Sequence, residues 1–153
     1  AAAKITALTA NSTVAEIEAA KAAYDALALK SKLNFNDELY AKLVNAVNGV
    51  NKIKADAVKA LKLTTKSSAK KGSITVKWTV KGDASAADGY QVWKSTKQSK
   101  GYKKAITTAK KSYKNTKGLK KGTRYYYKVR AYKVVDGKKV YSDWSNKAYR
   151  VAK

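Results

Sequence analysis

The sequence contains no cysteine, histidine, methionine or proline. Without cysteine and histidine there is no thiol nucleophile, no imidazole base, no Ser-His-Asp triad and no Cys/His zinc site. The 10 acidic residues are scattered along the chain. No apolar run approaches the length of about 20 residues that a transmembrane helix needs. We therefore predict a non-catalytic chain without a metal centre, a cofactor or a transmembrane segment.

The cellular compartment is only partly constrained by composition. A lack of cysteine suits either the cytosol or the exterior. The chain begins with Ala1-Ala2-Ala3 in place of methionine, which suits the mature side of a signal-peptide cleavage site. We expect a processed N-terminus and a secreted protein.

The positive charge is concentrated in the second half of the chain. Residues 1–63 carry nine lysines and six acids, a net +3, whereas residues 64–153 carry 25 bases and four acids, a net +21. Such a field attracts polyanions of many kinds. However, 22 of the 25 bases are lysines, so few arginines can read bases or phosphates in a bidentate manner. No nucleic-acid-binding motif is found, and we predict no specific nucleic-acid partner.

The first half has helical periodicity. Thr13 and Glu16 are spaced as a capping box, in which each side chain bonds to the other's backbone N–H. A helix is predicted from there to about Lys30, followed by a loop or short helical turn over residues 32–36. Asn36 or Asp37 can cap the next helix. The apolar stripe of the first helix consists of Val14, Ile17, Ala20, Tyr24 and Leu27.

A second, longer helix is predicted over residues 37–61. Its stripe consists of Leu39, Leu43, Ala46, Val50, Ile53, Ala57 and Leu61. At about 1.5 Å per residue this helix is about 37 Å long, against about 24 Å for its partner. The overshooting apolar end must therefore pack against residues 5–8, the following domain or another copy. The candidate assembly contacts are Ile5, Leu8, Ile53 and Leu61.

The second half alternates with period two, which is typical of half-buried strands. Ile74, Val76, Trp78 and Val80 share one face of a strand. Tyr125 and Tyr127 likewise lie on the opposite face from Tyr126 and Lys128. The polar stretch over residues 63–72 is either a linker or an irregular first strand.

The segment around Tyr125 closely resembles the start of strand F in a fibronectin type III domain. The positions that carry this resemblance are Leu119, Gly122, Thr123, Tyr125, Val129 and Ala131. It implies that Tyr125 is the corner tyrosine, whose hydroxyl bonds back to the preceding backbone. The flanking segments resemble the rest of the domain in order: strand B at 73–80, C at 88–95, C′ at 102–108, E at 112–119, the F–G loop at 135–138 and the start of G at 141–145.

The helical half resembles a module found in bacterial surface proteins, through residues 19–27 and 42–46. The two resemblances together imply an α+β multidomain chain. Residues 1–63 form a helical hairpin or three-helix bundle. Residues 64–153 form an all-β fibronectin type III sandwich of the immunoglobulin-like kind.

One face of the predicted sandwich is a candidate contact surface. If Tyr125 and Tyr127 point inward, an aromatic and cationic patch points outward, made of Trp93, Tyr126, Lys128, Arg130 and Tyr132. Cross-strand pairs of this kind can simply stabilise a solvated sheet face. They can also form a protein contact, or stack on sugar rings or nucleobases.

The sequence thus predicts a non-catalytic structural or adhesion protein of a bacterial surface. It would act as a spacer, an adhesin segment or a self-assembling subunit of a filament or array, and its partner would be another protein or copies of itself. The alternative is a binding module for anionic cell-wall or host glycans, which would use the basic aromatic face.

Overall fold

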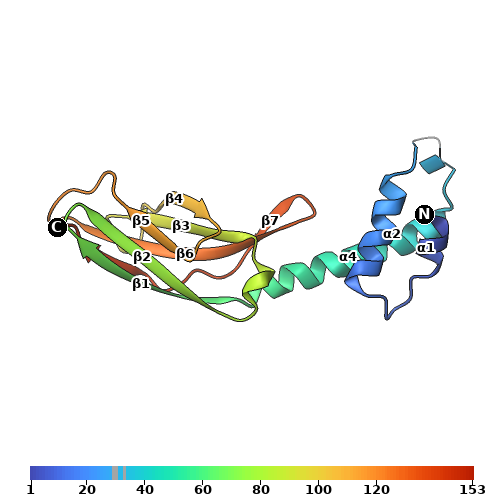
Figure 1. The fold of residues 1–153 in the computed structure, drawn as a ribbon, viewed down its shortest axis with the longest axis horizontal. Coiled ribbons are helices and arrows are strands. Elements are labelled where there is room, and N and C mark those ends of the chain that lie inside the picture. The colour runs from blue at the N-terminus through green and yellow to red at the C-terminus, as the bar shows by residue number, and fades with distance from the viewer. Residues whose placement is uncertain (29–30, 33) are drawn as a thin grey trace. The chain divides into compact units, whose positions relative to one another are not determined.

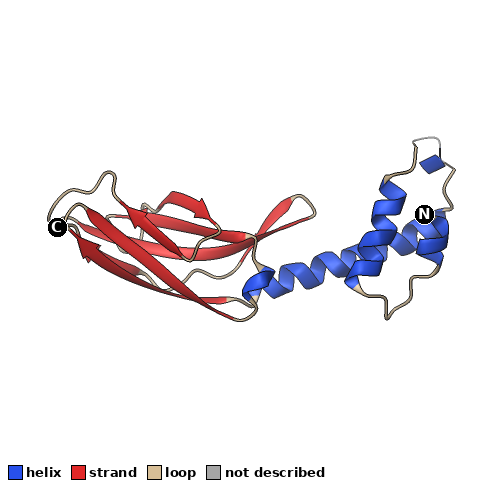
Figure 2. Cartoon of the chain, viewed as in Figure 1, coloured by secondary structure: helices blue, strands red, loops and turns tan. Residues whose placement is uncertain are grey.

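The computed structural model describes residues 1–28, 31, 32 and 34–153 (Figure 1). These residues form two compact units, Ala1–Ile53 and Lys54–Lys153. The division falls inside helix α4 (Asp37–Lys59), whereas the sequence placed the domain boundary between residues 63 and 64. The first unit is helical and the second is a β-sandwich (Figure 2).

The first unit contains α1 (Ala2–Thr6), α2 (Val14–Asp25) and the greater part of α4. The predicted capping box is present: the Thr13 N–H donates to Glu16 Oε2 at 2.7 Å, and the Glu16 N–H donates to Thr13 Oγ1 at 3.3 Å. Asn36 caps α4, because its Oδ1 accepts from the Leu39 N–H at 3.0 Å. Helix α2 ends at Asp25. The predicted helix end near Lys30, and Leu33 of the predicted loop, lie outside the described residues.

A small apolar core holds this unit together. Ile5 and Leu8 of the N-terminal segment are buried against Ala20 of α2 and Leu43 of α4. The ring of Tyr24 packs edge-on against that of Phe35, with centroids 5.1 Å apart. The N-terminal segment is therefore part of the helical core.

The second unit is a sandwich of two antiparallel sheets. One sheet has the order β1-β2-β5, with β1 at Lys62–Lys70, β2 at Ser73–Lys81 and β5 at Ser112–Asn115. The polar stretch after α4 is thus the first strand of the sandwich. The other sheet has the order β4-β3-β6-β7, with β8 also paired to β6. Its strands are β3 (Gly89–Ser95), β4 (Lys103–Thr108), β6 (Arg124–Val135), β7 (Lys138–Tyr141) and β8 (Ala148–Val151).

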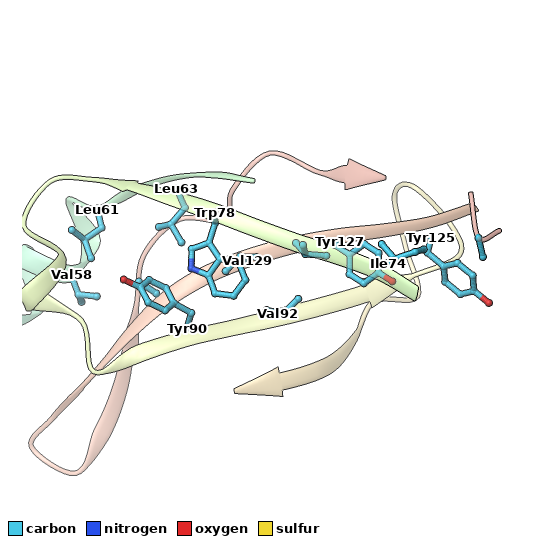
Figure 3. Packing of buried hydrophobic residues seen from close by; sticks show 13 residues of the cluster. Val58, Leu61, Leu63, Ile74, Trp78, Tyr90, Val92, Tyr125, Tyr127 and Val129 are labelled. Carbon is cyan, nitrogen blue, oxygen red and sulfur yellow. The ribbon is translucent and has the colours of Figure 1, made fainter. Parts of the chain in front are cut away.

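The sandwich core follows the predicted alternation of strand residues (Figure 3). Trp78 on β2 is 4% exposed and packs edge-on against Tyr90 on β3, with ring centroids 5.5 Å apart. Tyr127 and Val129 on β6 are fully buried between the sheets. The inward phase predicted for β2 and β6 is therefore confirmed.

The corner tyrosine is also confirmed. The Tyr125 hydroxyl donates to the Gly118 carbonyl at 3.1 Å and accepts from the Lys120 N–H at 2.9 Å. Gly118 and Gly122 have φ of +63° and +79°, a backbone conformation that favours glycine. These bonds fix the loop that leads into β6.

The last turns of α4 differ from the predicted stripe. Ile53 is 60% exposed and Ala57 is also exposed, whereas Val58 and Leu61 are buried in the sandwich core (Figure 3). Val58 and Leu61 are three residues apart and so share one face, which Ala57 does not. The heptad-like spacing fails here because the sandwich core, and not a partner helix, covers this end.

Candidate interaction face of the second sheet

Strand β6 presents its even-numbered side chains to the outer face of the second sheet. Tyr126, Lys128, Arg130 and Tyr132 are each half-buried, because aromatic rings from neighbouring segments pack beside them. We call the central group the outer stack. It consists of Trp93, Tyr102, Lys128, Arg130, Tyr141 and Trp144.

Arg130 lies at the centre of the outer stack. Its guanidinium carbon is 3.5 Å from the ring centre of Tyr141, 4.5 Å from that of Trp144 and 5.7 Å from that of Trp93. Its Nε and Nη2 both donate to Oε1 of the buried Gln91, at 3.1 and 3.0 Å. Loss of solvent lowers the pKa of Arg130. The ring faces and the amide together replace part of the lost hydration.

Lys128 occupies the next position along the stack. Its Nζ is 4.1 Å from the ring centre of Trp144 and 4.5 Å from that of Tyr102. Loss of solvent lowers the pKa of Lys128, and repulsion from Lys147 and Arg130 adds to this shift. The ammonium is thus held between two rings of the same chain.

Two serines position Trp144. Ser142 and Ser145 lie in the segment between β7 and β8, which is not itself a strand. The Ser145 N–H donates to the Val129 carbonyl at 2.8 Å, and its hydroxyl accepts from the Val129 N–H at 2.9 Å. Ser142 makes the same pair of bonds to Ala131, at 3.1 and 2.9 Å. Three residues thus span the distance of two on β6, and Trp144 between them lies over the outer face.

The remaining predicted residues lie at the margins of the stack. Tyr126 packs against Tyr149 with ring centroids 5.6 Å apart. Tyr132 has Lys139 Nζ 4.8 Å from its ring centre. Trp93 packs edge-on against Trp144 at 5.6 Å, and its buried Nε1 has no hydrogen-bond partner among the described residues. The five predicted residues therefore share one face, and a binding role for them stays a prediction.

Sequence reasoning did not identify Trp144, Tyr141 and Tyr102 as members of this face. The signal for the first two was present in Tyr141-Ser142-Asp143-Trp144-Ser145, which was interpreted only as the start of strand G. The position of Trp144 follows from the serine bonds and not from strand alternation, so a period-two pattern does not reveal it.

The predicted assembly contacts are mostly covered within the chain. Ile5 and Leu8 are buried in the helical core, and Leu61 is buried in the sandwich core. Ile53 alone of the four has an exposed side chain. Only that residue offers an apolar surface to another molecule.

Two further sets of residues were searched for functional groups. Across residues 1–28, 31, 32 and 34–153, no three acidic side chains converge in a way that could hold a metal ion. None of the helices in the described parts of the chain combines the length and the apolar character needed to span a bilayer.

Comparison with known proteins recovers the fold of the second unit. No family model and no curated protein matches the chain. An Fn3-like protein from Clostridium thermocellum is 25% identical, with a TM-score of 0.47 over 63% of this chain and 95% of that one. The fibronectin type III domain of human fibronectin type III domain containing protein 3 is 19% identical, with a TM-score of 0.45 over 58% and 84%.

A β-1,2-glucanase from Parabacteroides distasonis is 23% identical, with a TM-score of 0.49 over 62% of this chain. The chain spans only 13% of that enzyme's length. The strand order and the tyrosine corner establish the architecture directly: a helical part is followed by a fibronectin type III-like sandwich. Such a fold serves as a structural or binding module.

Proposed function

We propose that the chain is a non-catalytic structural module of an extracellular protein on a bacterial surface, acting as a spacer, an adhesin segment or a self-assembling subunit. The observation that carries this proposal is the outer stack. Lys128 and Arg130 already face rings of their own chain, at 4.1 and 3.5 Å. A ligand would have to displace these contacts to reach the cations. The stack therefore stiffens the sheet.

The location can be tested on cells that produce the protein. Protease added to intact cells should degrade the chain, whereas a cytosolic protein in the same cells should survive until lysis. Fractionation should find the chain with the envelope or the medium. Recovery of the protein only after lysis, resistant to external protease, would contradict the surface assignment.

Self-assembly can be separated from the spacer and adhesin roles by sedimentation. Ile53 is the exposed apolar residue of the predicted contacts, so Ile53→Lys should convert any assembly of the intact chain to monomers. Ile106→Lys is the matched control, because Ile106 is 36% exposed on β4 and undergoes the same chemical change. An intact chain that sediments as a monomer at about millimolar concentration would exclude the subunit role.

A second candidate function is binding of anionic glycans, and it is favoured by the net charge of +21 on residues 64–153. Long-range attraction of this kind raises the local concentration of polyanions before any specific contact forms. High salt should abolish this binding, because it rests on charge neutralisation. Contacts made through apolar surface should persist under the same conditions.

A further inference from the structure

The first sheet carries an unusual pair of like charges on its outer face. Lys66 on β1 and Lys77 on β2 are directly opposite each other in the strand register, and both are exposed. Side chains in such positions have Cβ atoms about 4.5–5.5 Å apart, and like charges there are destabilising. Strands β1, β2 and β5 contain no acidic residue that could offset the repulsion.

Two hollows meet at this pair. The first has a volume of about 420 Å³ and is lined by Thr64, Lys66, Lys77, Trp78, Thr79 and Lys111. The second, of about 360 Å³, follows the seam between β1 and β8 and is lined by residues that include Thr65, Lys66, Lys147 and Arg150. Both volumes fall in the range of about 300–1,000 Å³ that is usual for ligand sites. Lys66 lines both hollows and so connects them.

Side-chain bonds across the seam account for the second hollow. The Asn146 amide bonds to the backbone of Thr65, accepting from its N–H at 2.7 Å and donating to its carbonyl at 2.9 Å. The Ser67 hydroxyl donates to the Tyr149 carbonyl at 3.0 Å. The Thr65 hydroxyl is buried and has no partner within the described chain. The seam is thus closed at separate points, and a polar group in its wall remains unused.

Together the hollows join five exposed bases into a band that crosses from β8 over β1 and β2: Arg150, Lys147, Lys66, Lys77 and Lys111. We call this the basic belt. The acids of the sandwich lie elsewhere: Asp88 pairs with Lys133 and Asp143 with Lys62, each at 2.7 Å. None of the residues that the structure describes around the two hollows is acidic.

We propose that the basic belt binds a linear polysaccharide that bears carboxylate groups. Its charge is complementary to such a chain, and a bound carboxylate between Lys66 and Lys77 would relieve their repulsion. This inference gives a site to the second candidate function and does not depend on the structural role of the outer stack. It places the site on the opposite sheet from the one that the sequence indicated.

The chemistry of the belt favours a sugar acid over a nucleic acid. Four of its five bases are lysines, which act as point charges and do not form the bidentate pairs with phosphate that arginine makes. The hydroxyls of Thr64 and Thr79 lie opposite each other beside the lysine pair and can both donate to and accept from sugar hydroxyls. The lining aromatics offer no free face for a nucleobase, since Trp78 is 4% exposed and the ring of Tyr149 packs on Tyr126 and Arg124.

The test compares two charge reversals that are matched in chemistry. Lys77→Glu removes a belt charge and turns the Lys66–Lys77 pair into an opposite-charge pair, so folding should be preserved. Lys103→Glu is the control, because Lys103 on β4 is also exposed and also lies opposite a lysine, Lys94. Both variants have the same net charge. The probe is immobilised alginate oligomer, with neutral dextran as the blank, at about 0.1 M salt.

We expect wild type to bind alginate, Lys77→Glu to lose on the order of tenfold in affinity and Lys103→Glu to lose less than about threefold. Lys111→Glu, outside the strand register, should repeat the loss if Lys77→Glu fails to fold. Equal losses in belt and control variants would overturn the belt as the site. Absence of wild-type binding would overturn glycan binding altogether and leave the structural role intact. Tighter binding of polyphosphate or single-stranded DNA of equal length would overturn the sugar-acid assignment.

Discussion

The guanidinium of Arg130 lies 3.5 Å from the ring centre of Tyr141, although the two residues are not opposite each other in the sheet. The residue that is opposite Tyr141 is Tyr132, so Arg130 reaches diagonally across to its ring partner. Diagonal pairs of this kind are within reach of long side chains. The contact shows that the charge on this face is engaged by the chain's own rings.

Replacing Trp144 with alanine tests the outer stack. Because Trp144 covers Lys128, its removal should admit water and raise the pKa of Lys128 towards its ordinary value. NMR titration of the Lys128 ammonium would measure this change. The variant should also lose about 1–3 kcal/mol of unfolding free energy. Tyr149→Ala is the control, since Tyr149 packs on Tyr126 and Arg124; an equal pKa change in both variants would contradict the stack.

Replacing Ser145 with alanine tests the position of the segment that carries Trp144. The buried Val129 N–H would lose its acceptor, at a cost of about 1–3 kcal/mol in unfolding free energy. Hydrogen exchange at the Val129 amide should accelerate. Ser112→Ala on β5, where the serine is exposed, should change stability by less than about 0.5 kcal/mol. Unchanged exchange at Val129 would show that another group holds this N–H.

Replacing Trp78 with alanine tests the sandwich core. Trp78 is 4% exposed, so its truncation should cost about 3–5 kcal/mol, as for other buried large aromatics. Denaturant unfolding would measure this cost. Trp93→Ala should cost clearly less, because Trp93 is only half-buried on the outer face. A Trp78→Ala variant with an unchanged melting temperature would contradict the inward phase of β2.

Alkaline pH should destabilise the sandwich through Tyr127. Burial raises the pKa of Tyr127 from 10.0 to about 12, against the opposing effect of the Asn115 hydrogen bond. The unfolded chain therefore releases this proton first, so stability is intact below pH 10 and falls as pH rises from 10 to about 12. At about 1.4 kcal/mol per pKa unit, the loss is roughly 2–3 kcal/mol.

Unfolding free energies measured at pH 9, 10 and 11 would check this slope. Tyr127→Phe should be less stable at neutral pH, because Asn115 loses its partner, but its stability should fall less steeply over the same range. Burial also raises the pKa values of Tyr90 and Tyr113, so part of the slope should remain. An identical slope in both proteins would exclude Tyr127 as its source.

Much of the fold could be predicted because its signals are local. Strand alternation placed Trp78 and Tyr127 in the core, since side chains on a strand alternate between faces. The motif before β6 located the corner at Tyr125, and the spacing of Thr13 and Glu16 located the start of α2. Each of these depends on residues close together in the sequence, where backbone geometry alone decides the contact.

The candidate faces depended on tertiary structure for what they contain. Sequence periodicity placed the even-numbered residues of β6 outward, but Trp144 reaches them through hydrogen bonds between segments more than ten residues apart. The end of α4 could not be assigned to Val58 in preference to Ile53, because a helix stripe does not reveal what will cover it.

The sequence by itself thus determined the class of each half, the inward phase of the main strands, the corner and the excess of basic charge. Only the tertiary structure decided where that charge is free and where it is engaged. Lys128 and Arg130 are enclosed by rings, whereas Lys66 and Lys77 are brought face to face without a carboxylate. The physical reason is strand register: it pairs residues that are distant in sequence, and composition carries no information about that pairing.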